Sequence, residues 1–283
     1  MFIAIIGSRF SGKSTVEEYL IAKGFTSVHL RDKDLEAALS FSSPAMLLDH
    51  VTQHWRSNFV TTDLDSDRLV NYFIRRPFFM LLSIDAPILQ HPPTGFSLLR
   101  RASLQVKLKI GNHFDSIAEL HCHLDSLDIT NTNRLRPQWD TYFMTLADLA
   151  SQRSNCMKRR VGAILVREHR IVSTGYNGTP RGVKNCNDGG CGHCNRTSAT
   201  NGTECLCLHA EENALLEAGR DRVGANATMY CNTCPCLKCT IKIIQSGVKR
   251  VVYNLSYKVD EASARLFQEA GVEIFRHVPP PEP

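Results

Sequence analysis

The sequence predicts an α/β protein with two domains, and three observations lead to this fold class. A length of 283 residues allows about two domains, each large enough for a core of its own. The chain opens with a short apolar segment, a glycine-rich loop and a helix candidate. From residue 161 onward, short strand and helix candidates alternate with short turns between them. Such alternation predicts a mixed sheet covered by helices.

Composition limits the classes of partner and the compartment. A formal charge of +5 suits anionic small molecules such as nucleotides, but it is far below that of a nucleic-acid binder. Residues 1–6 lack the basic segment and the long apolar run of an export signal. No apolar stretch approaches the length of a membrane helix. We therefore expect a cytoplasmic protein, with the nucleus as a second compartment, whose cysteines bind metal rather than form disulfides.

Residues 1–112 are predicted to form a phosphate-binding α/β domain. Phe2–Ile6 is a buried-strand candidate, and the loop after it matches G-x-x-x-x-G-K-[ST] in full before a helix candidate at 16–22. In a working loop of this type, backbone N–H groups and the helix start hold phosphates, Lys13 reaches the terminal phosphates and Ser14 binds Mg²⁺. The predicted phosphate-loop residues are Gly7, Gly12, Lys13 and Ser14.

Phosphoryl transfer by this domain is a separate question. Phe78–Ile84 is a second buried-strand candidate and ends at Asp85, a position for a magnesium-orienting carboxylate, while Arg100 and Arg101 offer charge for a transferred phosphoryl group. Alternatively, Asp85 caps a turn and the arginines are solvated. The loop and the strand end loosely resemble nucleoside-monophosphate and dephospho-CoA kinases. A degenerate or regulatory domain is favoured over an active kinase.

Residues 113–136 are predicted to connect the two domains, because patterning weakens there and Asn131-Thr132-Asn133 is typical of a turn. His121-Cys122-His123 lies in this segment. A strand or a helix does not bring three consecutive side chains to one ion, so a surface or packing role is favoured for them.

Residues 137–283 are predicted to form the second domain. Its helices are expected at 141–151, 209–218, 236–246 and 260–270, the last three ending before Gly219, Gly247 and Gly271. Its strands are expected at 161–166, 170–174, 228–232, 248–254 and 272–277. A loop rich in Gly, Asn and Cys runs from 175 to 207, and the closing prolines form a frayed tail.

His209-Ala210-Glu211 and Pro235-Cys236-Leu237-Lys238-Cys239 together have the H-x-E and P-C-x-x-C pattern of zinc-dependent nucleobase deaminases. A catalytic zinc takes three protein ligands and keeps one position for water, and His209, Cys236 and Cys239 supply the three. Both segments open helix candidates, where a thiolate is stabilised. Glu211 is left to carry protons. Each segment alone fits a structural zinc site or an ordinary helix start, but their combination favours catalysis.

Six more cysteines precede this stretch, and a structural zinc site of four ligands is the favoured interpretation. Cys191-Gly192-His193-Cys194 lies in a glycine-rich loop, which is typical of a zinc knuckle and would hold a long loop in one conformation. Unbound loop thiols are the alternative. The pool is Cys156, Cys186, Cys191, Cys194, Cys205 and Cys207. Which four bind, and whether there is more than one ion, stays open. Cys234 is a packed neighbour or a substitute ligand of the catalytic zinc.

With these residues identified, residues 137–277 resemble the deoxycytidylate (dCMP) deaminase family, closely in its fungal two-domain form. The resemblance rests on Ser151–Cys156, Val161–Ala163, Gly175–Pro180, His209–Ala214 and Pro235–Cys239. It implies a cytidine-deaminase-like α/β/α sandwich after a P-loop kinase-like domain. It also implies hydrolysis of dCMP to dUMP and ammonia, supplying dUMP for thymidylate synthesis.

The resemblance further implies site residues and regulation. Asn177 is expected at the substrate sugar and base, and Tyr257 near the nucleotide. Family members are usually homohexamers activated by dCTP and inhibited by dTTP, and members with a second zinc place ligands at Cys156 and Cys186. The implied effector-binding residues are Gly175, Tyr176, Asn177 and Gly178.

In the implied mechanism, Glu211 takes a proton from the zinc-activated water, delivers it to ring N3 as C4 is attacked, and then protonates the departing amine. The 5′-phosphate needs a cationic or backbone-amide partner. The basic candidates are Arg153, Arg159, Arg160, Arg181 and Lys184.

Three alternatives compete with this function. The first is another deaminase of the superfamily, acting on a nucleoside, a free base, a riboflavin precursor or tRNA. The second is a nucleic-acid editing protein, which needs base-stacking aromatics and a basic channel that are not evident here. The third is a P-loop kinase or sensor with a structural zinc module, which Glu211 argues against.

Overall fold

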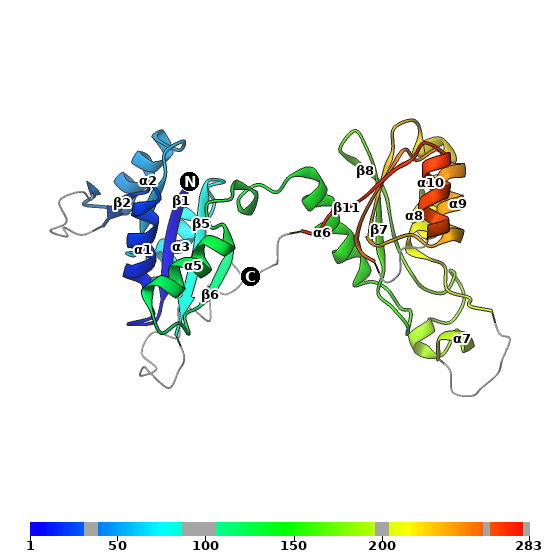
Figure 1. The fold of residues 1–283 in the computed structure, drawn as a ribbon, viewed down its shortest axis with the longest axis horizontal. Coiled ribbons are helices and arrows are strands. Elements are labelled where there is room, and N and C mark those ends of the chain that lie inside the picture. Colours follow the sequence, from blue (N-terminus) through cyan, green and yellow to red (C-terminus); the bar gives the residue numbers. More distant parts are fainter. Residues whose placement is uncertain (31–38, 87–105, 196–203, 257–260, 280–283) are drawn as a thin grey trace. The chain divides into compact units, whose positions relative to one another are not determined.

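The computed structural model describes residues 1–30, 39–86, 106–195, 204–256 and 261–279. It consists of two compact units, Met1–Pro137 and Gln138–Pro280, each with its own sheet (Figure 1). Within the described ranges, no helix is long and apolar enough to cross a membrane.

The first unit contains a six-stranded sheet in the order β3-β2-β4-β1-β5-β6, and all its strand pairs are parallel. The strands are β1 (Phe2–Gly7), β2 (Thr26–His29), β3 (Leu39–Ser40), β4 (Phe59–Thr61), β5 (Phe79–Asp85) and β6 (Leu108–Gly111). The helices are α1 (Lys13–Ala22), α2 (Pro44–Gln53), α3 (Asp67–Phe73) and α5 (Ile117–Leu127), with a 3-10 turn at Thr132–Arg134.

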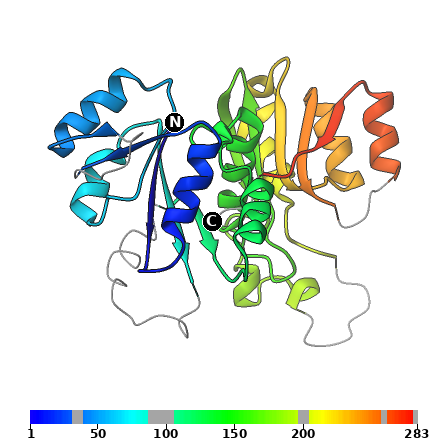
Figure 2. The same cartoon turned by 60° about the vertical axis from the view of Figure 1, so that its left-hand side comes forward.

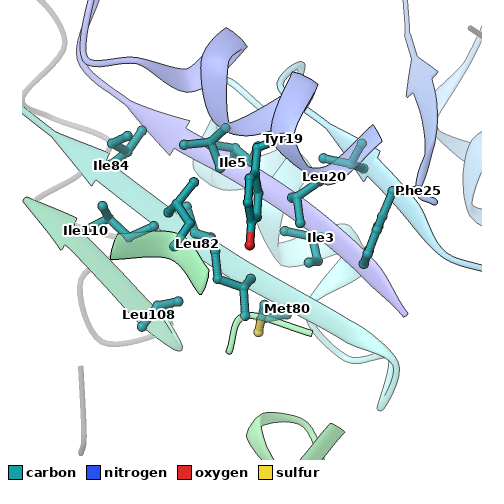
Figure 3. Close-up of a cluster of buried hydrophobic side chains, with 14 of the residues drawn as sticks. Ile3, Ile5, Tyr19, Leu20, Phe25, Met80, Leu82, Ile84, Leu108 and Ile110 are labelled. Atoms are coloured by element: carbon teal, nitrogen blue, oxygen red, sulfur yellow. The ribbon is translucent and has the colours of Figure 1, made fainter. Parts of the chain in front are cut away.

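Both faces of this sheet are covered, which explains the continuous apolar sequence of β1. Ile5 of β1 and Leu82 of β5 belong to a buried cluster with Tyr19 and Leu20 of α1 (Figure 3). Phe2, the first residue of β1, points to the opposite face, where the cluster includes residues of α2 and α3. The alternation of side chains along a strand therefore divides β1 between two cores.

The segment 113–136, predicted as a connection, instead completes the first unit. Its helix α5 buries Leu120 and Leu124 in the same cluster as α1. Ile117, Leu120, Leu124 and Leu127 recur at helical spacing after the N-cap Ser116, so the sequence contained a helical pattern that the prediction overlooked. His121 packs its ring 5.2 Å from that of Tyr19, and Cys122 is exposed.

The second unit contains a five-stranded mixed sheet in the order β11-β10-β9-β7-β8, which confirms the predicted mixed sheet. Its strands are β7 (Gly162–Arg167), β8 (Arg170–Tyr176), β9 (Thr228–Thr233), β10 (Arg250–Leu255) and β11 (Glu273–Arg276). β7 runs antiparallel to β8 and β9, whereas β9, β10 and β11 are parallel. Its helices are α6 (Trp139–Ser151), α7 (Gly192–Asn195), α8 (Ala210–Val223), α9 (Leu237–Ser246) and α10 (Glu261–Glu269), with a 3-10 turn at Cys186–Asp188.

Helices cover both faces of this sheet and give three layers. Ala163 of β7 packs in a cluster with residues of α8, α9 and α10, whereas its neighbour Ile164 packs in a cluster with Phe143 of α6. Figure 1 and Figure 2 show α9 and α10 together on one side of the sheet. This arrangement leaves the starts of α8 and α9 at the same end of the strands, where β8 and β9 end and β7 begins.

α9 ends at the predicted glycine, whereas α8 continues past the glycine that was predicted to end it. Gly247 closes α9 in the left-handed conformation, with φ +90°. Gly219 also has a positive φ, +67°, but the chain resumes a helical turn after it and α8 reaches Val223. Val223 is fully buried, so packing of this residue accounts for the continuation.

Candidate active site and metal centre

The starts of α8 and α9 bring the residues of the two sequence motifs together. His209 precedes α8 as its N-cap, and Cys236 does the same for α9, both with extended backbone. α8 follows an isolated bridge between Gly178 and Leu208, and α9 follows the end of β9. Both helices pack on one face of the sheet, and the residues that precede them lie side by side.

His209, Cys236 and Cys239 form a compact donor group. The Nδ1 atom of His209 lies 3.4 Å from the Sγ atom of Cys236 and 3.3 Å from that of Cys239. In tetrahedral zinc with Zn–S near 2.3 Å and Zn–N near 2.0 Å, a nitrogen and a sulfur ligand are roughly 3.5 Å apart. One imidazole and two thiols at this spacing have the size and chemistry of a zinc site with one position left open.

The contacts within this group stabilise a thiolate at Cys236. The contact with Cys239, and then that with His209, lowers the pKa of Cys236 to about 3, against the effect of burial. The same contact raises the pKa of Cys239, and the hydrogen bond with Cys236 raises the pKa of His209. Backbone N–H groups and the dipole at the start of α9 also stabilise a thiolate there, and a bound zinc ion would hold both sulfurs as thiolates.

Glu211 lies within the first turn of α8 and is only 4% exposed. Burial raises the pKa of its carboxyl group above the usual range of glutamate. A carboxyl group of raised pKa next to a metal-donor group can exchange protons near neutral pH. The neighbouring His209 and a hydrogen bond with Cys239 oppose this increase.

A pocket of about 310 Å³ opens on this group. His209, Glu211 and Cys236 form part of its wall, and Asn177 forms another part. Two basic residues, Lys158 and Arg159, also line it. A volume in this range suits a small organic ligand.

The pocket separates the five basic residues among which the sequence could not choose a partner for the 5′-phosphate. Of the five candidates, Arg159 is a pocket residue. Sequence reasoning missed Lys158, which lies next to it in the loop between α6 and β7. The sequence offered one indication of its role: Lys158 lies close to Val161–Ala163, one of the segments on which the family resemblance rests.

Asn177 holds the loop that carries these two cations. Its Oδ1 accepts a hydrogen bond from the backbone N–H of Val161 (2.8 Å), and its Nδ2 donates to the backbone carbonyl of Arg159 (2.9 Å). The side chain is 7% exposed and lines the pocket. The structure therefore places Asn177 at the pocket and gives its amide a positioning role.

The neighbouring residues of the predicted effector loop pack against α8. A Cβ atom on Gly175 would lie 2.1 Å from the backbone oxygen of Ala210, so only glycine allows β8 to approach the helix start this closely. The backbone carbonyl of Tyr176 accepts a hydrogen bond from Asn213 (2.9 Å). A Cβ atom on Gly178 would meet the side-chain amide of Asn155 at 2.5 Å. Effector binding by this loop stays a prediction, and Tyr257 lies outside the described residues.

The remaining cysteines separate into distinct settings. Cys234 is half-buried and lines the pocket, but it is not part of the donor group with His209. The six upstream cysteines gather in two overlapping groups of four, which share Cys194 and Cys207. These groups lie in the loop region between β8 and α8 and include Cys156 from the end of the α6 loop.

The glycine-rich loop of the first unit joins β1 to α1 as the sequence predicted. Gly12 is the N-cap of α1 with φ +101°, and a Cβ atom on Gly7 would lie 2.2 Å from the backbone oxygen of Ile84. The Nζ atom of Lys13 donates to the carbonyl oxygens of Gly7 (3.0 Å) and Ser8 (2.6 Å), and burial lowers its pKa. Ser14 lies in the first turn of α1.

Asp85 lies at the end of β5, which pairs with β1 at this loop, and its Oδ1 accepts a hydrogen bond from Ser8 (3.4 Å). Arg100 and Arg101 lie outside the described residues.

Comparison with known proteins agrees with the donor group. Residues 137–255 match the family model of the cytidine and deoxycytidylate deaminase zinc-binding region. The chain is 44% identical to the deoxycytidylate deaminase of Schizosaccharomyces pombe, with 98% of each chain covered. It is 41% identical to that of Saccharomyces cerevisiae, with 97% of this chain and 96% of the relative covered. The dCMP deaminase of cyanophage S-TIM5, solved with dCMP and dUMP, is 32% identical over 50% of this chain and 98% of its own, with a TM-score of 0.42.

Proposed function

Because the chain belongs to the deoxycytidylate deaminase family, in the two-domain form of its fungal members, we propose that it hydrolyses dCMP to dUMP and ammonia. The observation that carries the proposal is the placement of buried Glu211 beside the donor group of His209, Cys236 and Cys239. The product dUMP is the precursor for thymidylate synthesis.

The three donors fit a catalytic zinc in number and in type. Their ligand atoms all lie within 4.8 Å of one another, and no fourth side chain of the described residues joins the group. A catalytic zinc keeps this fourth position for water. When bound, zinc lowers the pKa of its water ligand, so that hydroxide is available near neutral pH.

Glu211 carries the protons of the reaction. Its carboxylate takes a proton from the attacking water and delivers it to ring N3 while the bond to C4 forms. The carboxylate then takes the remaining proton of the added hydroxyl group and donates it to the amine at C4, which leaves as ammonia while the C4 carbonyl forms. Burial suits this double role, since a pKa raised toward neutrality lets one carboxyl group act as base and then as acid.

Lys158 and Arg159 bind the 5′-phosphate in this proposal, because both line the pocket that contains Glu211. We expect Lys158→Ala and Arg159→Ala each to raise KM for dCMP by roughly tenfold, with little effect on deoxycytidine. Arg160→Ala is the matched control, since Arg160 is the next residue and is not part of the pocket wall. Equal losses on both substrates in the two variants would remove the phosphate role.

The test of the whole proposal is loss of the cytosine ultraviolet absorbance when purified protein is mixed with dCMP. We expect saturable turnover, and a kcat/KM for deoxycytidine that is lower by roughly 100-fold or more. Comparable rates on the nucleoside or a free base would instead support another deaminase of the superfamily. The same assay with dCTP and dTTP, and the mass of the native assembly, measure the predicted activation, inhibition and hexamer.

For the first unit we propose that the loop Gly7–Ser14 binds nucleotide phosphates with Mg²⁺. Its support is the turn at Gly12 and the position of the Lys13 ammonium group within the loop. Titration calorimetry with Mg-ATP should show binding that Lys13→Ala abolishes. Lys23→Ala, on the exposed side near the end of α1, is expected to keep it.

A further inference from the structure

We propose that the six cysteines upstream of His209 hold two zinc ions in one thiolate cluster, with Cys194 and Cys207 each bridging both ions. The proposal concerns a site separate from the catalytic donor group and does not depend on the identity of the substrate. It follows from the way in which the two groups of four cysteines overlap.

Each group of four has the size of a tetrahedral zinc site. Within each group, all four Sγ atoms lie within 4.8 Å of one another. Sulfur ligands about 2.3 Å from one zinc ion stand roughly 3.8 Å apart. The measured Sγ–Sγ distances are 3.8 Å for Cys156–Cys194, 3.5 Å for Cys194–Cys205, 3.9 Å for Cys191–Cys205 and 3.9 Å for Cys194–Cys207.

The number of sulfur atoms decides between shared and separate ions. Two independent four-cysteine sites need eight ligands, but the two groups together contain six because Cys194 and Cys207 belong to both. Two tetrahedral zinc ions that share two bridging sulfur atoms need six sulfur ligands, which is the number present. A single ion would use one group and leave two thiols of the other group without a metal, although these also lie within 4.8 Å of the shared pair.

No other cysteine described in the structure completes a separate site. Cys122 belongs to the first unit, and Cys231 and Cys234 are not part of either group. The cluster is therefore complete in itself, with Cys156 and Cys186 ligating one ion and Cys191 and Cys205 the other.

Burial supports metal binding rather than a set of free thiols. Cys186 and Cys191 are fully buried and Cys207 is 9% exposed, in a hydrophobic cluster composed of cysteines alone. A loop region without a conventional apolar core needs another source of order, which metal–thiolate bonds supply. Sharing two ligands also leaves a net charge of about −2 on the cluster, half that of two separate four-thiolate sites.

The surrounding loop provides the polar contacts expected around a metal site. The backbone N–H of Met157 donates to the Sγ atom of Cys186 (3.4 Å), and Nδ2 of Asn195 donates to the same sulfur (3.7 Å). Asn195 also binds the backbone carbonyls of Cys186 (2.7 Å) and Cys191 (2.8 Å). A Cβ atom on Gly190 would lie 1.7 Å from the carbonyl oxygen of Lys184, so the tight turn between the two cysteines requires glycine.

The cysteine cluster adjoins the pocket of the candidate active site. Cys156, Cys194, Cys205 and Cys207 line the same pocket as Glu211. Cys207 precedes His209 by two residues, and Cys156 precedes Lys158 by two. We infer that the two ions position the catalytic histidine and the phosphate-binding loop, without contact with the reacting atoms.

The experiment is metal analysis of the full-length protein by native mass spectrometry, together with ¹¹³Cd NMR after metal exchange. We expect three ions per chain, with two tetrathiolate cadmium signals that are coupled to each other through the bridging sulfurs. The third signal, from the catalytic site, should be uncoupled and should disappear in Cys236→Ser. Two ions per chain, or three without coupling between any two, would overturn the proposal.

Variants then distinguish bridging from terminal ligands. Cys156→Ser is expected to lose one ion, whereas Cys194→Ser and Cys207→Ser should lose two. Cys122→Ser is the matched control and should keep all three. If the bridging variants fail to fold, the NMR coupling in the unaltered protein still decides the matter. Absence of dCMP turnover with all three ions present would contradict the proposed function and leave the cluster intact.

Discussion

His209, Cys236 and Cys239 take their positions from two helix starts, whereas the six upstream cysteines lie in a region with only short helical turns. Each catalytic donor has a packed sheet and a helix behind it, and the group opens on the pocket. The cysteine groups instead form their own buried cluster. We therefore expect the first site to keep its structure without metal, and the second site to depend on the proposed zinc ions for its structure.

The largest effect expected from this difference is at Glu211. Glu211→Gln removes the proton carrier and keeps the donor group, so kcat should fall by roughly 10³-fold while the zinc content stays the same. Glu212→Gln is the control, because Glu212 forms an ion pair with Lys242 on the adjacent helix and should keep most of the turnover. Near-normal kcat in Glu211→Gln would remove this residue from its role.

Metal removal tests which site depends on its metal for structure. The catalytic ion would have three protein ligands, whereas each ion of the proposed cluster would have four, among them the fully buried Cys186 or Cys191. A chelator should therefore take one ion per chain first, with complete loss of turnover and little change in Tm. Removal of the other ions should lower Tm and expose thiols. Zinc content, turnover and melting measured on the same samples check the order, and structural loss before loss of turnover would reverse the comparison.

Gly175→Ala tests the support behind the catalytic donors. The new methyl group would meet the backbone of Ala210 at 2.1 Å, so β8 and the start of α8 must separate. Overpacking of this kind costs about 1–3 kcal/mol, and the shift should also lower kcat. Gly192→Ala is the control, since nothing lies within 4 Å of its Cβ position. Urea unfolding together with initial rates would show whether stability and kcat change in the same variant.

Asn195→Ala gives the smallest expected effect. It removes hydrogen bonds to the carbonyls of Cys186 and Cys191 but no sulfur ligand. We expect a loss of about 1–2 kcal/mol of unfolding free energy, with kcat and metal content unchanged. A loss of two ions in this variant would mean that the loop holds the sulfurs in place and that the metal contributes little.

The catalytic group was accessible from sequence because its residues occupy fixed positions at helix starts, where spacing determines which side chains meet. The cysteine groups were not, since a loop without periodicity does not reveal which sulfurs converge; only the pool of six could be named. The helix α5 was missed although Leu120, Leu124 and Leu127 recur at helical spacing, because the polar residues around them were interpreted as a connection between domains. Lys158 was missed because the sequence of a loop does not indicate which of its residues lie beside a pocket.

Leu208 exchanges backbone hydrogen bonds with Gly178 in both directions, 3.2 Å and 2.9 Å, and stands between Cys207 and His209. In an extended segment, residues two apart project to the same side, so the segment around this isolated bridge would carry one ligand of each proposed metal site. Occupancy of the two centres should then be thermodynamically linked. If zinc in the thiolate cluster raises the affinity of the catalytic site for its ion by some factor, then zinc in the catalytic site must raise the affinity of the cluster for its ions by the same factor.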